Sequence, residues 1–453
     1  MLEEHFLPDF PPAVCAEINA LPASPPPPAG CRDLRGLLWS SIDNTDSRDL
    51  DQIEWAEKLP DGRIRVLVAI ANVGGTVRAG SAIDAQARAN ATSVYAAGPV
   101  FPMLPEKLST DLTSLGQHAD RTAVLIEFVV DESGGVVCAD VSPVAVRNRA
   151  RLNYTQVGRW LQGAAAAPAD GVVPAGLTEQ LRLQAEAATR LQKFRKEQGA
   201  LALDADEPNP ASEIIESFMI AANVAMSKFL RDRSFLCLAR VVRTPKRWDR
   251  IQAIAAQFGT KLPAEPDSRA LSDFLASRRQ ADPERFPEVS LGVLKSLGPG
   301  EYMVQRPGTE SVGHFGLAVE DYTHSTAPNR RYADLIMQRL VTACLGQAAA
   351  PFSEEELTGL ALHCTERESA ARHVERLMQK VAAALALGPR VGQTFDAIVT
   401  GVSPKGVFAR LLAVAAEGRI MRGERGLDVG EKIRARLAGV DVNKGFIDLE
   451  AVG

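Results

Sequence analysis

Apolar and polar residues alternate along the first third of the chain, which is the pattern of β-strands. The run from Ala123 to Val130 is apolar enough for a strand that is buried on both faces, and a turn over 131–135 joins it to the next strand as a hairpin. A helix is predicted over 82–90. The predicted strands of this region, from about 36 to 145, are 37–41, 53–59, 64–70, 123–130 and 136–139.

Helical spacing replaces alternation from about residue 154, and short strands return after Gly392. The segment 213–230 is apolar nearly all round, which predicts an interior helix. Five short strands with glycines at the bends predict a small OB-type barrel. The expected helices are 177–197, 213–230, 333–345 and 354–387, and the expected barrel strands are 395–402, 406–412, 418–420, 431–437 and 445–449. The fold class is therefore α+β, a mixed sheet packed by helices and followed by a β-barrel.

These patterns divide the chain into three parts. Residues 1–35 are predicted as a short helix followed by a Pro-rich linker over 22–30 in the extended polyproline conformation. Residues 36–389 form the main body. Residues 390–453 form the barrel, with the boundary at Gly388–Arg390.

Composition narrows the function classes. The 453 residues are 46% hydrophobic and 24% charged, as in ordinary globular proteins, and the net charge is −5, so any site for a polyanion must be a local groove. The six cysteines include no CxxC pair, which argues against a zinc ribbon and a disulfide framework and favours the reducing cytoplasm. No apolar run is long enough to span a membrane and no signal peptide is evident, so no membrane partner is expected.

Four aspartates occupy one connection between two predicted strands: Asp43, Asp46, Asp49 and Asp51. Such closely spaced carboxylates repel one another unless a positive charge lies among them, and Mg²⁺ or Mn²⁺ prefers carboxylate oxygens. The alternative is a solvated acidic loop, and spacing alone does not decide between the two.

Several further segments, in the same order, resemble the ribonuclease II / ribonuclease R (RNB) family. The residues that carry the resemblance are the acidic loop, Thr92–Tyr95 followed by Phe101–Ser109, His314–Ala318 and the box Tyr322–Leu335, which is similar to the family's SPIRRYxDL box. The barrel is similar to the S1 RNA-binding domain that ends these enzymes. The resemblance covers about residues 36–450.

The resemblance implies a metal site and a catalytic set. In the family an Asp after a strand is followed at +6, +8 and +9 by further Asp, and the matching positions here are Asp43, Asp49, Asp51 and Gln52. These four would hold Mg²⁺, or Mn²⁺, with Asp49, Asp51 and Arg330 as the catalytic residues. Gln52 departs from the family pattern, because an amide oxygen can ligate a metal but carries no charge.

The resemblance also implies contacts with RNA. Tyr95 would stack on a terminal base, Tyr154 would lie near the 3′ end, Arg330 would clamp a phosphate and Glu375 would lie near the active site. The alternatives are core packing for both tyrosines, an ion pair with Asp334 for Arg330, and a solvated helix face for Glu375. Where the family often has an aromatic residue, this chain has Leu203.

The implied function is a processive 3′→5′ exoribonuclease, acting as a monomer, that hydrolyses single-stranded RNA to nucleoside 5′-monophosphates. A catalytically impaired RNA-binding member of the family is the alternative that Gln52 keeps open, and a metal-dependent endonuclease is a third. The family usually carries two cold-shock domains before the catalytic body. Only about 35 residues precede it here, so a shorter and more open path for RNA is expected.

Overall fold

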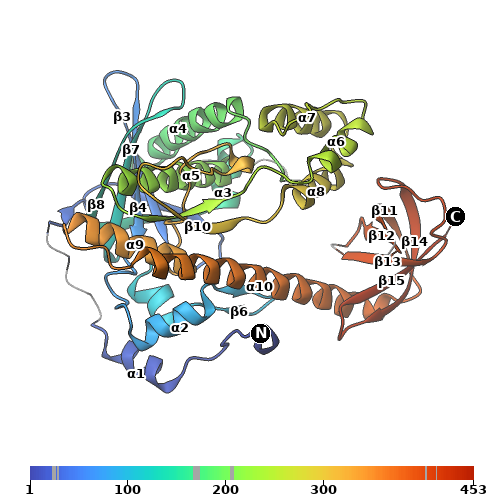
Figure 1. Ribbon diagram of the computed structural model, residues 1–453, viewed down its shortest axis with the longest axis horizontal. Helices are drawn as coiled ribbons and strands as arrows, with labels where there is room; N and C mark the ends of the chain where they lie inside the picture. The colour runs from blue at the N-terminus through green and yellow to red at the C-terminus, as the bar shows by residue number, and fades with distance from the viewer. Residues whose placement is uncertain are drawn as a thin grey trace.

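The computed structural model describes residues 1–22, 27, 30–166, 174–204, 209–403, 406–414 and 416–452, the side chain of Cys138 excepted. Figure 1 shows a large body of sheet and helices and a small barrel, joined by the long helix α10 (Glu354–Leu387). The N-terminal segment runs along the body near α10, and the C-terminus lies in the barrel. Most of the linker expected over 22–30 falls outside the described residues.

Six strands form the main sheet, and the strands predicted there are confirmed. Their order is β1-β8-β2-β3-β4-β7, and β8 also pairs with β7, so the pairing runs in a ring. The bounds are β1 Arg32–Asp33, β2 Trp39–Asp43, β3 Gln52–Lys58, β4 Ile64–Ala71, β7 Asp120–Val130 and β8 Val136–Asn153.

Strand β8 is much longer than the predicted 136–139. It pairs antiparallel with β7 and then parallel with β2. The three arginines Arg147, Arg149 and Arg151 conceal the strand pattern in the sequence, because they lie between the buried Val146, Asn148, Ala150 and Leu152. The alternation is therefore present, with charged side chains on one face and buried ones on the other.

Helices cover the sheet, and α5 is the interior helix that the sequence predicts. It packs against α4, α3 and strands β7 and β8, and most of its residues are buried. These helices and α9 are bounded as follows: α3 Tyr154–Leu161, α4 Leu177–Glu197, α5 Pro210–Asp232 and α9 Tyr332–Leu345.

The region between α5 and α9 contains elements that the sequence analysis did not predict. Strands β9 and β10 pair with each other, and α6–α8 pack around a separate cluster that includes Trp248, Phe274 and Phe286. The bounds are β9 Cys237–Val241, α6 Trp248–Ala256, α7 Ser268–Ala281, α8 Phe286–Leu297 and β10 Glu301–Gln305.

Two short helices, one pair of two-residue strands and four short helical turns complete the described part of the chain before the barrel. They are α1 Pro12–Ala20, α2 Ala82–Asn90, the paired strands β5 Val94–Tyr95 and β6 Val100–Phe101, and the short turns η1 Leu2–Glu4, η2 Lys107–Leu112, η3 Phe315–Leu317 and η4 Gly388–Arg390.

The predicted C-terminal barrel is confirmed as a closed five-stranded barrel in the order β11-β12-β13-β15-β14. Ala384 and Leu387 at the end of α10 belong to its core. The strands are β11 Thr394–Ser403, β12 Gly406–Leu411, β13 Ala416–Arg422, β14 Lys432–Asp441 and β15 Phe446–Ala451.

Among the described residues, no helix has both the length and the apolar character needed to cross a membrane. The five cysteines whose side chains are described are free: Cys15, Cys31, Cys237, Cys344 and Cys364.

Candidate active site

The acidic loop connects the end of β2 to the start of β3. Asp43 closes β2, and its Oδ1 accepts hydrogen bonds from the Asn44 amide at 2.7 Å and from Ser47 Oγ at 2.8 Å. Ser114 holds the far end, because its Oγ accepts from the Leu50 amide at 3.0 Å and donates to the Arg48 carbonyl at 2.8 Å. The loop is thus fixed by its own turn and by a residue distant in the sequence.

Asp51 is the carboxylate that joins this loop to the Arg330 segment. Its side chain is only 4% exposed; Oδ1 accepts from the Asn329 amide at 3.0 Å, and Oδ2 lies 3.8 Å from Arg330 Nε. Burial raises the pKa of Asp51 to about 7, and the nearby Asp49 adds to this rise while Arg330 opposes it. Burial likewise raises the pKa of Asp49, with Asp43 adding to the rise.

Arg330 and Arg331 are adjacent but differ in their partners. Arg331 Nη2 donates to Asp334 Oδ1 at 2.8 Å in a buried pair, so the structural ion pair that the sequence left open for Arg330 is made by Arg331. The carbonyl of Arg330 accepts from the Ser93 amide at 3.0 Å and from Thr92 Oγ1 at 3.2 Å. The backbone of Arg330 is therefore anchored, and its side chain remains 45% exposed beside Asp51.

Tyr95 faces the same site. The residue is 42% exposed, yet burial raises the pKa of Tyr95 to about 12, with Arg330 opposing the rise and Asp49, Asp51 and Asp43 adding to it. The phenol is thus within electrostatic range of all three carboxylates. The Tyr95 amide donates to Glu375 Oε1 at 2.9 Å, so Glu375 fixes the backbone of Tyr95.

A cavity of about 270 Å³ brings Tyr95, Arg330 and Glu375 together. Glu368 and Arg372 of α10, the buried Tyr302 and the half-buried His324 also line it. The acidic loop and Tyr154 are not among its lining residues. Tyr154 is the first residue of α3. Burial raises the pKa of its hydroxyl, and the charges of Asp43 and Glu54 add to this rise. Tyr154 therefore lies on the side of the site near Asp43.

The sequence of the chain was compared with models of known protein families. Residues 31–347, more than half of the chain, match the model of the RNB domain. The chain belongs to the RNB family. Residues 393–452 match the RNase II-type exonuclease C-terminal S1 domain, which agrees with the closed barrel.

Individual RNB relatives agree with the family model. Ribonuclease R of Thermotoga maritima is 28% identical over 459 residues, which cover 93% of this chain and 62% of that protein. The chain spans about half the length of other curated ribonuclease R proteins. Mycoplasma genitalium RNase R, solved in complex with ribose methylated single-stranded RNA, has the same fold with a TM-score of 0.88 at 23% identity, covering 100% of this chain and 77% of that one.

The RNB fold alone does not decide whether a chain is active. Yeast Ssd1, described as a pseudonuclease, shares the fold with a TM-score of 0.71 at 15% identity, over 92% of this chain and 53% of that one. Activity must therefore be argued from the side chains of the site.

The donor atoms of this RNB site fit a hard divalent cation. Three carboxylates and the Gln52 amide offer oxygen ligands, and burial, which raises the pKa of Asp49 and of Asp51, disfavours their charged forms unless a cation lies nearby. Within the described part of the chain, no three Asp, Glu, His or Cys side chains already lie close enough to form a ready-made metal cluster. A cation would thus have to draw the loop carboxylates together.

Glu54 of the RNB domain was missed by the sequence analysis. It is completely buried in β3, opposite Ser40 of β2, and neither carboxyl oxygen has a hydrogen-bond partner among the described residues. Burial, with Asp43 adding to it, raises the pKa of Glu54 well above its usual range. The sequence gave no sign of this, because a Glu in an alternating strand normally faces solvent.

Asn329 is a second residue that the analysis did not single out. Its backbone amide donates a hydrogen bond to Asp51, and its Oδ1 accepts a hydrogen bond of 2.6 Å from Thr113 Oγ1. Its place directly before Arg330 in the motif was the available signal. Leu203, where the family often has an aromatic residue, packs against the α6–α8 cluster.

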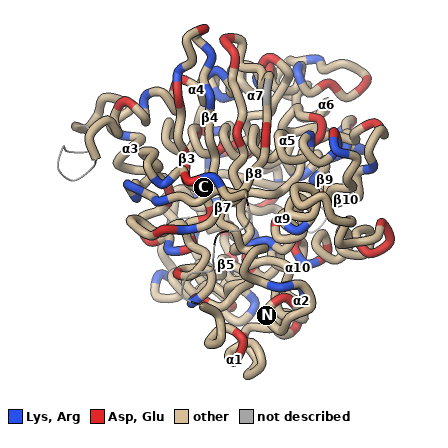
Figure 2. The backbone as a smooth tube through the Cα atoms, turned by 90° about the vertical axis from the view of Figure 1, so that its left-hand side faces the viewer, with Lys and Arg blue, Asp and Glu red and all other residues tan. Residues whose placement is uncertain are grey.

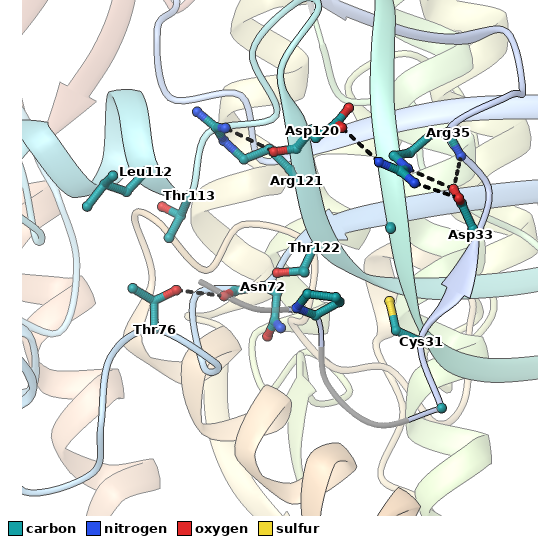
Figure 3. A pocket seen from close by; sticks show the side chains of 13 residues that line it. Cys31, Asp33, Arg35, Asn72, Thr76, Leu112, Thr113, Asp120, Arg121 and Thr122 are labelled. Atoms are coloured by element: carbon teal, nitrogen blue, oxygen red, sulfur yellow. Dashed lines mark hydrogen bonds and ion pairs between the residues drawn. The ribbon is translucent and has the colours of Figure 1, made fainter. Parts of the chain in front are cut away.

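A larger cavity of about 440 Å³ is lined by residues that include Asn72, Thr76 and Thr122 (Figure 3). Thr113 also lines this cavity, and Asn329 connects it to Asp51 through one hydrogen bond with each of the two residues. The charged side chains at its rim pair with one another: Arg35 binds Asp33 at 2.7 Å and Asp120 at 2.9 Å. We assign no part of the candidate site to it.

Proposed function

We propose that this RNB chain is a Mg²⁺- or Mn²⁺-dependent, processive 3′→5′ exoribonuclease that hydrolyses single-stranded RNA to nucleoside 5′-monophosphates. The observation that carries the proposal is the meeting of buried Asp51 with Arg330, 3.8 Å apart, beside the exposed ring of Tyr95. The names of the ribonuclease R relatives and the RNA complex of the Mycoplasma protein support the substrate class. The expected cytoplasmic location and monomeric state remain predictions.

Each residue has a role that its surroundings allow. Asp43, Asp49, Asp51 and Gln52 would hold the cation, which would supply an activated water and offset the charge on the scissile phosphate. Arg330, anchored through its carbonyl, would direct its planar guanidinium at a phosphate oxygen. Tyr95, with its backbone fixed by Glu375, would stack on a terminal base, and Tyr154 would border the site beside Asp43.

The charge distribution agrees with a local rather than a global RNA site. Figure 2 shows basic and acidic residues interspersed over the view, without a single basic face. Binding would therefore depend on the groove around Arg330 and on stacking, which tolerates any base.

A catalytically impaired RNA-binding protein is the second candidate. Gln52 favours it, since the loop has one carboxylate fewer than the family pattern, and the Ssd1 fold shows that an RNB-like body can be a pseudonuclease. The retained Asp43, Asp49 and Asp51 oppose it, because three carboxylates next to an anionic ligand weaken binding unless a cation lies among them.

A 5′-labelled single-stranded oligoribonucleotide, incubated with the protein in Mg²⁺ and separately in EDTA, tests the proposal. Progressive shortening to a limit fragment only with metal is the expected result. Binding without shortening would favour the RNA-binding alternative, and Gln52→Asp would then be expected to restore cleavage. Internal fragments from the earliest time point would instead indicate an endonuclease.

A further inference from the structure

The first nine residues are docked onto the body beside the candidate active site. The backbone of Leu7 pairs with the side chain of Asn90 at the end of α2: its amide donates to Oδ1 and its carbonyl accepts from Nδ2, both at 2.9 Å. Gln86 Nε2 also donates to the carbonyls of Leu7 and Asp9 at 3.3 Å. These bonds fix the path of the chain after the turn η1.

Phe6 is the side chain that this segment buries. It is 0% exposed and packs with Val94 of β5 and with Ala371 and Val374 of α10. The Arg367 guanidinium lies 3.8 Å from the centre of the Phe6 ring, and Arg367 Nη2 donates to the Glu4 carbonyl at 2.9 Å. Phe6 thus fills the space between β5 and α10.

The neighbour of Phe6 belongs to the segment that supports the catalytic arginine. Val94 is buried, and the next residue, Tyr95, is exposed, as expected for alternate sides of a strand. In the same segment, Thr92 and Ser93 bind the carbonyl of Arg330. Residues 92–95 therefore position both Tyr95 and Arg330, and Phe6 packs against them from the side away from the site.

We propose that Phe6 is a positioning residue, which holds the segment 92–95 so that Tyr95 and Arg330 meet the RNA. The inference rests on the proposed function for the identity of the ligand. The N-terminal segment would then support RNA binding indirectly, through residues 92–95, without touching the RNA itself.

The test measures binding of a labelled single-stranded oligoribonucleotide in EDTA by fluorescence anisotropy, so that no cleavage is needed. Phe6→Ala is expected to weaken binding about fivefold or more, because small displacements of positioning groups are costly. Phe6→Leu, which keeps an apolar side chain at this position, is expected to restore most of the loss. Leu2→Ala, in the same segment but 71% exposed, is the matched control and is expected to bind like the unmodified chain.

A double-mutant cycle separates positioning from a general loss of structure. If Phe6 acts through the segment that carries Tyr95, Phe6→Ala weakens binding much less in a Tyr95→Ala background than in the unmodified chain. Equal loss in both backgrounds, or no loss from Phe6→Ala alone, would overturn the inference. If Phe6→Ala does not fold, Arg367→Ala releases the segment without emptying the Phe6 site, and the same cycle applies.

The outcomes distinguish this inference from the proposed function. A chain that binds RNA but never shortens it with Mg²⁺ overturns the exonuclease proposal and leaves the binding cycle fully informative. A chain that cleaves RNA but shows no coupling between Phe6 and Tyr95 overturns only the role of Phe6.

Discussion

Asp51 differs from the other carboxylates of its loop because of where its neighbours come from. Asp46 is exposed, whereas Asp51 is buried against the Asn329–Arg330 peptide, 278 residues further along the chain. Burial raises the pKa of Asp51 to about 7, because the Arg330 guanidinium, 3.8 Å away, and the single hydrogen bond from the Asn329 amide offset only part of the cost of burying the charge. In the proposed metal site, a cation beside Asp51 would offset the cost of burying its charge.

Asp51→Asn is expected to abolish hydrolysis while leaving RNA affinity within about threefold. The amide keeps the size of the side chain and can still accept from the Asn329 amide, but it removes the charge that would hold the proposed metal. Mutation of residues that only orient metal ligands typically lowers metal affinity or activity about 10–100-fold. Replacement of a ligand itself should therefore lower kcat by more than about 100-fold.

Single-turnover cleavage with Mg²⁺ and anisotropy in EDTA measure the two quantities. Asp61→Asn, in the exposed turn after β3, is a control that should behave like the unmodified chain. Full activity of Asp51→Asn would remove the metal-loop argument.

At the scale of elements, short turns near the site depend on neutral side chains. His314 caps the turn η3, and its Nδ1 accepts from the Leu317 amide at 3.2 Å, which only an unprotonated nitrogen can do. Burial, with the charge of Arg240 adding to it, lowers the pKa of His314 to about 4. Its ring also contacts Tyr322, with 5.4 Å between the ring centres.

This pKa predicts an acid-sensitive contribution to stability. The folded state resists protonation of His314, while the unfolded chain binds a proton near pH 6.5, so the contribution is complete above 6.5 and is lost as the pH falls toward 4. His314→Asn keeps a cap acceptor but does not titrate. Both proteins are expected to lose stability between pH 7 and pH 5. The loss in free energy of unfolding should be smaller for the His314→Asn variant, by about 1–2 kcal/mol.

Urea denaturation at both pH values measures the difference. Parallel pH dependence of the two proteins would show that His314 already titrates normally in the folded chain.

At the scale of the whole molecule, the S1 barrel is attached through both a helix and ion pairs. Leu387 of α10 is buried in the barrel core, and Arg410 of β12 lies 2.6 Å from Glu288 of α8, whose side chain is 5% exposed. The barrel thus contacts the α6–α8 region as well as the end of α10.

Removing the barrel should separate binding from chemistry. A chain that ends at Gly388, with Leu387→Gln to avoid an exposed apolar end, is expected to bind a long single-stranded RNA about tenfold or more weakly, because one of two linked binding modules is lost. Cleavage of a short oligomer that fills only the catalytic site should change less than about threefold.

The same preparation, assayed on both RNAs, gives the comparison, and the full-length Arg410→Ala variant controls for loss of the Glu288 contact alone. Equal loss on long and short RNA would mean that the barrel is part of the folded core.

The sequence by itself determined the features that depend on near neighbours in the chain. Periodicity of two and of 3.6 residues identified most strands and helices, including interior α5 and the five barrel strands, because these patterns require only local geometry. The ordered motifs, from the Asp43 loop to the box around Arg330, also identified the family. The sequence missed the length of β8 and the elements between α5 and α9, where charged residues or short segments blur the local pattern.

The tertiary structure alone decided which of these residues meet and which are buried. Only folding shows that Asp51 contacts Arg330 and that Arg331 makes the pair with Asp334. It alone also shows that Glu54 is buried with no hydrogen-bond partner for its carboxyl oxygens in the described part of the chain. The packing of Phe6 behind Tyr95 likewise joins segments far apart in the sequence. Such contacts bury charge and surface between distant parts of the chain, and their energies depend on neighbours that no local pattern contains.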